Sequence, residues 1–137
     1  MNQLAVPVSP GELLDKITIL EIKSVRIRDA TKLANVRREL EALQHTWDGS
    51  NFAATDVAAD KDALRTVNER LWKIEDDIRD KERAQAFDGE FIRLARAVYV
   101  ENDERAAIKR RINTRLGSAL IEEKSYSDYR PAGTAGP

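Results

Sequence analysis

The sequence contains no cysteine, and it has only one histidine and one methionine among 137 residues. The absence of cysteine excludes disulfide bridges, thiolate metal sites and cysteine nucleophiles, and one histidine leaves little for a transition-metal site. We therefore expect neither a metal ion nor a cofactor. A chain without cysteine is also compatible with a reduced, cytoplasmic setting.

Long apolar runs and an excess of charge are missing as well. No stretch of 18 apolar residues occurs, and the first residues, MNQLAVPVSPGE, lack a basic region followed by an apolar core. Neither a membrane span nor a secretion signal is predicted, so we expect a cytoplasmic protein. The 23 Lys and Arg residues nearly balance the 24 Asp and Glu residues, and no overall field attracts nucleic acid or an anionic membrane.

Glycine and proline are scarce inside the chain, where Ala, Leu, Glu, Arg, Lys and Asp dominate. This composition is typical of all-α proteins. We predict one helical domain over residues 1–130 and a disordered tail over 131–137. The domain is expected to be an antiparallel bundle of about four helices that begins with a helical hairpin. In the stretch SPGE, Ser9 can cap the first helix, and Glu12 can reach back to complete a capping box.

Apolar residues at helical spacing predict three further helices at about 31–47, 60–85 and 89–116. The stretch WDGSN ends the second helix, FDGE separates the third from the fourth with Asp88 as N-cap, and Gly117 ends the fourth. The stretch VENDE is a poor helix interior, so the fourth helix either continues straight or breaks near Asn102.

The first helix is apolar on two sides. At about 100° per residue, Leu13, Ile17 and Leu20 share a broad face, whereas Ile22 and Val25 fall almost opposite. We expect the broad face to pack on the third and fourth helices. Ile22 and Val25 are expected to meet a second helix layer, a homodimer mate or another helical protein. The solvated strip is then predicted to contain Glu12, Asp15, Lys16, Lys23 and Arg26.

Glu21 has two interpretations, because it lies within or beside the apolar arc of this helix. In the first, it pairs with Arg28 at the rim of the packed surface, since long charged side chains commonly cover apolar area. In the second, it is an inward carboxylate with a chemical role.

A polar stripe follows the third helix at spacings of three and four residues, namely Asn68, Trp72, Glu75, Arg79 and Glu82. It is either a surface ladder in which Glu75 pairs with Arg79, or the polar wall of a ligand pocket.

The fourth helix has a buried arc that begins apolar and ends polar. Phe91, Ala95, Val98 and Tyr99 lead along the same arc to Asn102, Arg105, Lys109 and Asn113. In a straight helix, buried Arg105 and Lys109 require partners such as Glu75, Glu21 or an anionic ligand. In a broken helix, the same residues are simply solvated. The candidate ligand-binding residues are Glu21, Asn68, Trp72, Glu75, Arg79, Asn102, Arg105, Lys109 and Asn113.

The basic run RAAIKRRINTR does not indicate nucleic-acid binding, because its cations spread around the helix and acidic neighbours offset them. Phosphate-binding loops and nucleophile elbows are also missing. His45 is expected to have a surface or capping role at the end of the second helix. An RNA-binding function is the least favoured of those considered.

Four stretches resemble an uncharacterised family of small helical bacterial proteins, some of which are named for lipopolysaccharide biosynthesis. The stretches are SPGELLDKITILEIKSVRI, VNERLWKIEDDIR, FIRLARAVYVENDERAAIKRRIN and GSALIEEKSY, and together they cover most of residues 6–129. The resemblance implies a link to surface polysaccharide, but it brings no established activity to carry over to these residues.

Two functions follow as expectations. The first is a helical binding or interaction module, in a surface-polysaccharide pathway, that binds a partner protein or a small anionic ligand. The second is a cofactor-free helical enzyme that acts on an anionic metabolite, by analogy with chorismate mutase. In the second, Arg79, Arg105 and Lys109 would hold the anion while Glu75 or Glu21 accepts a proton.

Overall fold

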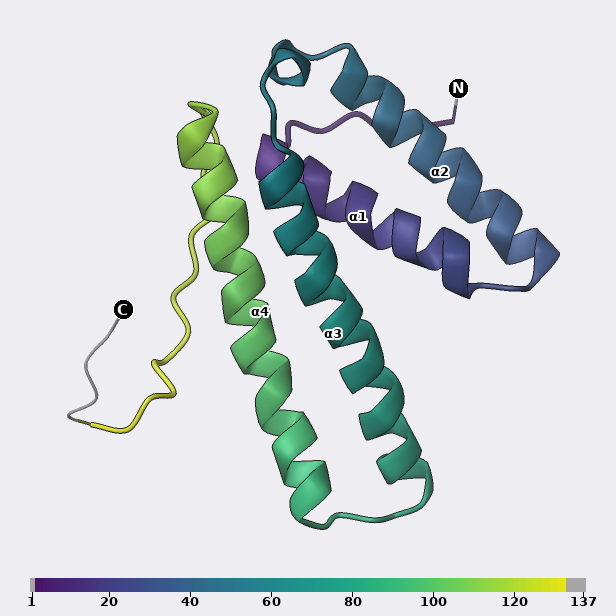
Figure 1. The fold of residues 1–137 in the computed structure, drawn as a ribbon, viewed down its shortest axis with the longest axis vertical. Coiled ribbons are helices and arrows are strands. Elements are labelled where there is room, and N and C mark those ends of the chain that lie inside the picture. Colours follow the sequence, from purple (N-terminus) through teal and green to yellow (C-terminus); the bar gives the residue numbers. More distant parts are fainter. Residues whose placement is uncertain (1, 133–137) are drawn as a thin grey trace.

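The computed structural model describes residues 2–132, and its helices form two hairpins (Figure 1). No strand occurs within these residues, so the prediction of an all-α fold with an N-terminal helical hairpin is confirmed. In chain order, the elements are α1 (Pro10–Arg26), α2 (Ala30–Asp48), the short 3-10 helix η1 (Asn51–Ala54), α3 (Ala58–Arg83) and α4 (Gly89–Arg115).

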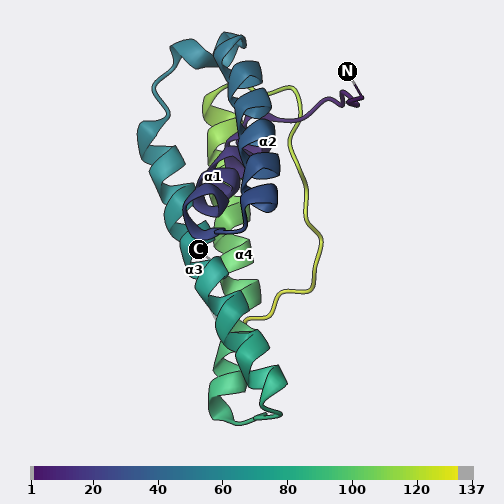
Figure 2. The same ribbon diagram turned by 90° about the vertical axis from the view of Figure 1, so that its right-hand side faces the viewer.

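The two hairpins differ in length and cross each other. α3 and α4 run antiparallel and pack side by side, while α1 lies across one end of this pair and α2 packs on α1 (Figures 1 and 2). The other end of the α3–α4 hairpin extends past α1 and α2 as a two-helix arm. Since α1 contacts all three other α-helices, it is the organising element of the fold.

The core lies where α1 crosses α3 and α4. The prediction that Leu13, Ile17 and Leu20 face inward is confirmed, because all three are buried. Each such side chain stabilises the fold by about 1.5–3 kcal/mol relative to an exposed position. The core cluster consists of Leu13, Leu14, Ile17, Trp47, Val57, Leu64, Val67, Leu71, Ile108 and Ile112.

The helix ends follow the signals in the sequence. Ser9 Oγ accepts a hydrogen bond from the Glu12 amide at 3.1 Å, and Asp88 Oδ1 accepts one from the Phe91 amide at 3.0 Å. Just past α4, Gly117 has a φ of 64°, the left-handed conformation that glycine adopts most easily. The predicted capping box forms only in part, because the Glu12 carboxylate is directed toward Lys109.

α4 is one uninterrupted helix, and the expected alternative of a break near Asn102 is wrong. The polar residues of VENDE do not compete with the helix backbone here. The Asn102 amide oxygen accepts a hydrogen bond from Arg105 at 2.8 Å, and Asp103 and Glu104 are exposed. A straight α4 therefore carries its polar arc toward α1.

One prediction for α1 is wrong. Asp15 was expected on the solvated strip but is only 5% exposed, because α3 packs on that side and Asn68 binds its carboxylate. Val25 is 83% exposed in the last turn of α1, so no second helix layer within the described residues covers it, and a homodimer mate or another helical protein stays the expected neighbour. Ile22, by contrast, is buried within the chain beside Leu71 of α3.

After α4, the chain turns back along that helix in an irregular stretch, residues 118–132, which we call the strap (Figures 1 and 2). The strap includes the first two residues of the predicted disordered tail, and residues 133–137 lie outside the described part of the chain. No helix in the described part is both long and apolar enough to span a bilayer.

Candidate functional site

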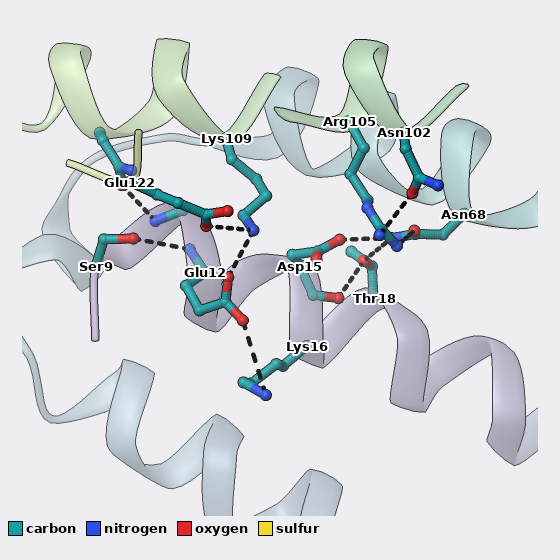
Figure 3. Close-up of polar contacts among 12 residues, drawn as sticks. Ser9, Glu12, Asp15, Lys16, Thr18, Asn68, Asn102, Arg105, Lys109 and Glu122 are labelled. Carbon is teal, nitrogen blue, oxygen red and sulfur yellow. Dashed lines mark hydrogen bonds and ion pairs between the residues drawn. The ribbon is translucent and has the colours of Figure 1, made fainter. Parts of the chain in front are cut away.

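Arg105 of α4 lies in the polar surface between α1, α3 and α4, beside Asn102, Asn68 and Asp15 (Figure 3). Its Nη1 donates to Asn68 Oδ1 at 3.2 Å, and its Nη2 donates to Asn102 Oδ1 at 2.8 Å. Both acceptors are neutral amides, and no carboxylate of the described residues forms an ion pair with Arg105 within 4.0 Å. The partly buried guanidinium is therefore held in position while its charge remains uncompensated by direct contact.

The amides that hold Arg105 belong to a buried network on α1 and α3. Asn68 Nδ2 donates to Asp15 Oδ1 at 2.8 Å and to Thr18 Oγ1 at 3.0 Å. The Thr18 hydroxyl in turn donates to the backbone carbonyl of Asp15 at 2.8 Å. Because Asp15, Thr18 and Asn68 are all buried, these bonds fix the Asn68 oxygen that faces Arg105.

One groove, which we call the Arg105 groove, contains most of the predicted site. It has a volume of about 450 Å³, and Trp72 and the apolar side chains of Ile19, Ile22 and Leu71 form part of its wall. Its candidate residues come from the predicted stripe on α3 and from the polar arc of α4. These candidates are Asn68, Trp72, Glu75, Arg79, Asn102 and Arg105.

A second groove, which we call the Lys109 groove, adjoins the first at Arg105. It has a volume of about 640 Å³, and its charged wall consists of Glu12, Asp15, Lys16, Arg105, Lys109 and Glu122. Lys109 Nζ lies 2.6 Å from Glu12 Oε2 and 3.0 Å from Glu122 Oε2 (Figure 3). Lys109 therefore already has two carboxylate partners within the chain.

These contacts move the pKa values of the pair apart. Burial alone would raise the pKa of Glu12, but the hydrogen bond and charge of Lys109, with smaller effects of Lys16 and Arg105, hold it below its ordinary value of 4.5. Burial would lower the pKa of Lys109, but hydrogen bonds to Glu12 and Glu122 hold it above 10.5. Both groups are therefore charged at neutral pH.

The other cations of the basic run on α4 have carboxylate partners. Arg110 Nη1 lies 3.0 Å from Glu123, and Arg111 and Arg115 lie 3.0 and 3.1 Å from the two oxygens of Asp60. These ion pairs explain the run as a set of structural contacts between α4, α3 and the strap. Arg105 differs from them because it binds amides.

Two candidate residues lie away from the grooves, and a third is part of a surface ladder. Glu21 faces Arg65 and Lys61 of α3 at 2.7 and 3.5 Å, so the predicted pair with Arg28 is replaced by contacts with α3. Asn113 is buried and accepts a hydrogen bond from the Gly11 amide at 2.7 Å, which ties α4 to the start of α1. Arg79 pairs with Glu75 at 3.2 Å as in a surface ladder, although both line the Arg105 groove.

Sequence reasoning missed three residues of this site: Asp15, Thr18 and Glu122. Asp15 and Thr18 share the face of α1 that meets Asn68, and a polar pair spaced by three residues beside Leu14 and Ile17 is the signal that could have identified them. Glu122 lies in an irregular segment, whose path has no periodic signature.

The structure also shows where the acidic side chains and the histidine considered for catalysis lie. Glu21, one of the two expected proton acceptors, does not reach Arg105 or Lys109, and Glu75 is half-exposed and paired with Arg79. His45 is exposed in the last turn of α2. No group of three or more His, Cys, Asp or Glu side chains within residues 2–132 could hold a metal ion.

Comparison with known proteins places the chain in a family. No curated protein matches it, and no solved structure does. A family model described as "Family of unknown function (DUF6165)" matches residues 4–137, which is nearly the whole chain. The protein therefore belongs to the DUF6165 family.

Proposed function

We propose that this protein is a helical binding module that takes a small anionic ligand in the Arg105 groove. The observation that carries the proposal is the environment of Arg105. Its guanidinium is partly buried, two amide oxygens hold it, and no described carboxylate neutralises it within 4.0 Å. An oriented guanidinium with free N–H donors binds phosphate or carboxylate in a bidentate manner at little ordering cost.

The rest of the groove supports a ligand that also has a flat or apolar part. Trp72 lines the groove next to Ile22 and Leu71, and an indole ring stacks on an aromatic base or on the apolar face of a sugar. The charged residues of the groove are three cations and two carboxylates, namely Lys23, Arg79, Arg105, Glu75 and Asp76. This excess of one positive charge favours an anion.

The family resemblance seen in the sequence suggests the natural ligands to test first. A role in surface-polysaccharide biosynthesis favours phosphorylated precursors such as nucleotide sugars, which combine anionic groups with flat rings. The expected cytoplasmic setting gives access to such compounds.

The test is the binding of phenyl phosphate, which has one anionic group and one flat ring. Calorimetry and tryptophan fluorescence would measure the affinity of wild type, Arg105→Gln and Arg65→Gln. Arg65 is the matched control because it is also a partly exposed arginine, but Glu21 pairs with it at 2.7 Å. A charged hydrogen bond contributes about 1.5–3 kcal/mol, so Arg105→Gln should weaken binding about tenfold or more, whereas Arg65→Gln should not.

Contact with a second protein chain is a second candidate, and an exposed stripe on α4 with two apolar side chains favours it. Ile92 and Val100 are exposed by 57% and 43% and lie on one face of the helix, with the exposed Arg96 between them. Phe87, at the tip of the arm, is exposed by 54%. A homodimer or a helical partner could cover this stripe without involving the Arg105 groove.

A further inference from the structure

The strap runs along α4 and closes one side of the Lys109 groove. Glu122 contacts Lys109, and further along the strap Tyr129 packs against Tyr99, with 4.9 Å between ring centroids. Since the strap proceeds from residue 122 to 129 while its partners on α4 go back from 109 to 99, the two run antiparallel. Leu120 and Ile121 of the strap also line the groove.

The strap is attached to the helices by few contacts. The Ser118 amide donates to the Asn113 carbonyl at 2.9 Å, and beyond Ser118 no backbone hydrogen bond within the described part of the chain links the strap to a helix. Its ion pairs to α4 involve Glu122 and Glu123, whose side chains are exposed by 49% and 72%. The ion pairs with these exposed carboxylates contribute little stability, and the Tyr99–Tyr129 contact lies at the far end of the strap, so the segment around Glu122 can detach at small cost.

The net charge of the Lys109 groove depends on whether Glu122 lies in it. With Glu122 in place, the groove holds three carboxylates and three cations. Once Glu122 leaves, the cations Lys16, Arg105 and Lys109 outnumber the remaining carboxylates by one. The Lys109 groove then has an excess of one positive charge, as the Arg105 groove does, and Arg105 lines both grooves.

The spacing of the two central cations fits a ligand with two charges. Arg105 and Lys109 are one helical turn apart on α4, which separates their Cβ atoms by about 5–6 Å. Two linked phosphate groups can span such a distance, one at each cation.

We propose that Glu122 is a built-in anionic occupant of the Lys109 groove, and that a ligand with two linked anionic groups, such as a diphosphate ester, displaces it. One anionic group binds Arg105, the other replaces the Glu122 carboxylate at Lys109, and the strap is released. The proposal rests on the proposed function of Arg105 and adds a ligand class and a regulated segment to it.

The experiment compares wild type, Glu122→Gln and Glu123→Gln in the full chain, with inorganic phosphate and inorganic pyrophosphate as probes. Glu123 is the matched control because it forms a pair of the same length, 3.0 Å, on the same strap, but with Arg110. Calorimetry measures the affinities, and amide hydrogen exchange measures the protection of residues 118–130 with and without pyrophosphate.

In wild type, pyrophosphate should bind more tightly than phosphate and should increase exchange in the strap. Glu122→Gln should bind pyrophosphate about two- to fivefold more tightly, the range expected for removal of one weak ion pair, and Glu123→Gln should bind it as wild type does. Equal or weaker binding by Glu122→Gln, or a strap whose exchange is unchanged by pyrophosphate, would overturn the inference.

The two proposals can fail separately. Phenyl phosphate binding that depends on Arg105, together with no effect of Glu122→Gln on pyrophosphate, leaves the proposed function standing and removes only the role of the strap. If neither wild type nor Glu122→Gln binds phenyl phosphate, phosphate or pyrophosphate, both proposals are wrong.

Discussion

Gly11 is a point of close approach between α1 and α4, and Gly11→Ala tests whether this contact fixes the site. A Cβ atom at Gly11 would lie 2.6 Å from the backbone oxygen of Lys109 and 2.8 Å from Asn113 Oδ1. The first atom belongs to a helix backbone and cannot rotate away. The second accepts the buried hydrogen bond from the Gly11 amide, so moving it breaks that bond.

The cost can be worked out from these contacts. Overpacking and the loss of a buried hydrogen bond each cost about 1–3 kcal/mol, while alanine favours a helix over glycine by about 0.5–1 kcal/mol. We therefore expect a net loss of about 1–5 kcal/mol in the free energy of unfolding. With an unfolding entropy of about 2.1 cal/mol/K per residue, this lowers the Tm of the 137-residue chain by about 3–17 °C.

Thermal unfolding followed by circular dichroism measures the effect, and Gly89→Ala is the matched control. Gly89 is the first residue of α4, and a Cβ atom there would meet no atom within 4 Å. This substitution should leave Tm unchanged or raise it slightly. A Gly11→Ala variant as stable as wild type would refute the tight contact between α1 and α4, and with it the placement of Lys109 beside Glu12.

Two further predictions concern pH and association. In the folded protein, the pKa of Glu12 is held below 4.5. The Glu12–Lys109 pair therefore stabilises the fold above pH 4.5, and this stabilisation is lost as the pH falls through the folded-state pKa of Glu12. The Tm difference between wild type and Glu12→Gln should therefore be constant above about pH 5 and shrink below it, and a difference that widens in acid would contradict the Glu12–Lys109 contact. Sedimentation should show self-association of wild type that Ile92→Glu abolishes, and a strictly monomeric wild type would argue against the α4 stripe as a homodimer surface.

The positions of the helices were predictable because local chemistry sets them. Ser9, Asp88 and Gly117 mark helix ends through their own side chains or backbone, and the structure uses all three as predicted. The continuity of α4 was left open, because the stretch VENDE has poor helix propensity. In the structure, the Asn102 side chain accepts a hydrogen bond from Arg105 and does not compete with the helix backbone.

The burial of α1 was harder to predict because that helix has two apolar arcs. Periodicity alone cannot say which polar residue a neighbouring helix covers, and Asn68 of α3 provides the partner that allows Asp15 to be buried. Val25 lies on the second arc, yet no described part of the chain covers it. Tertiary packing therefore reversed the expectation for Asp15, and for Val25 it leaves only a neighbour from outside the described residues.

The candidate site was predictable where residues share one helix. Spacings of three and four residues brought Asn68, Trp72 and Glu75 to one wall, and a straight α4 added Arg105. The partner of Lys109 was not predictable, since Glu122 reaches it from an irregular strap.

Anion binding by Arg105 can be measured directly by calorimetric titration of phenyl phosphate into wild type, Arg105→Gln and Arg65→Gln. We expect binding by wild type and Arg65→Gln, with affinity about tenfold or more weaker in Arg105→Gln. Equal affinities in wild type and Arg105→Gln, or no binding by wild type, would contradict this expectation.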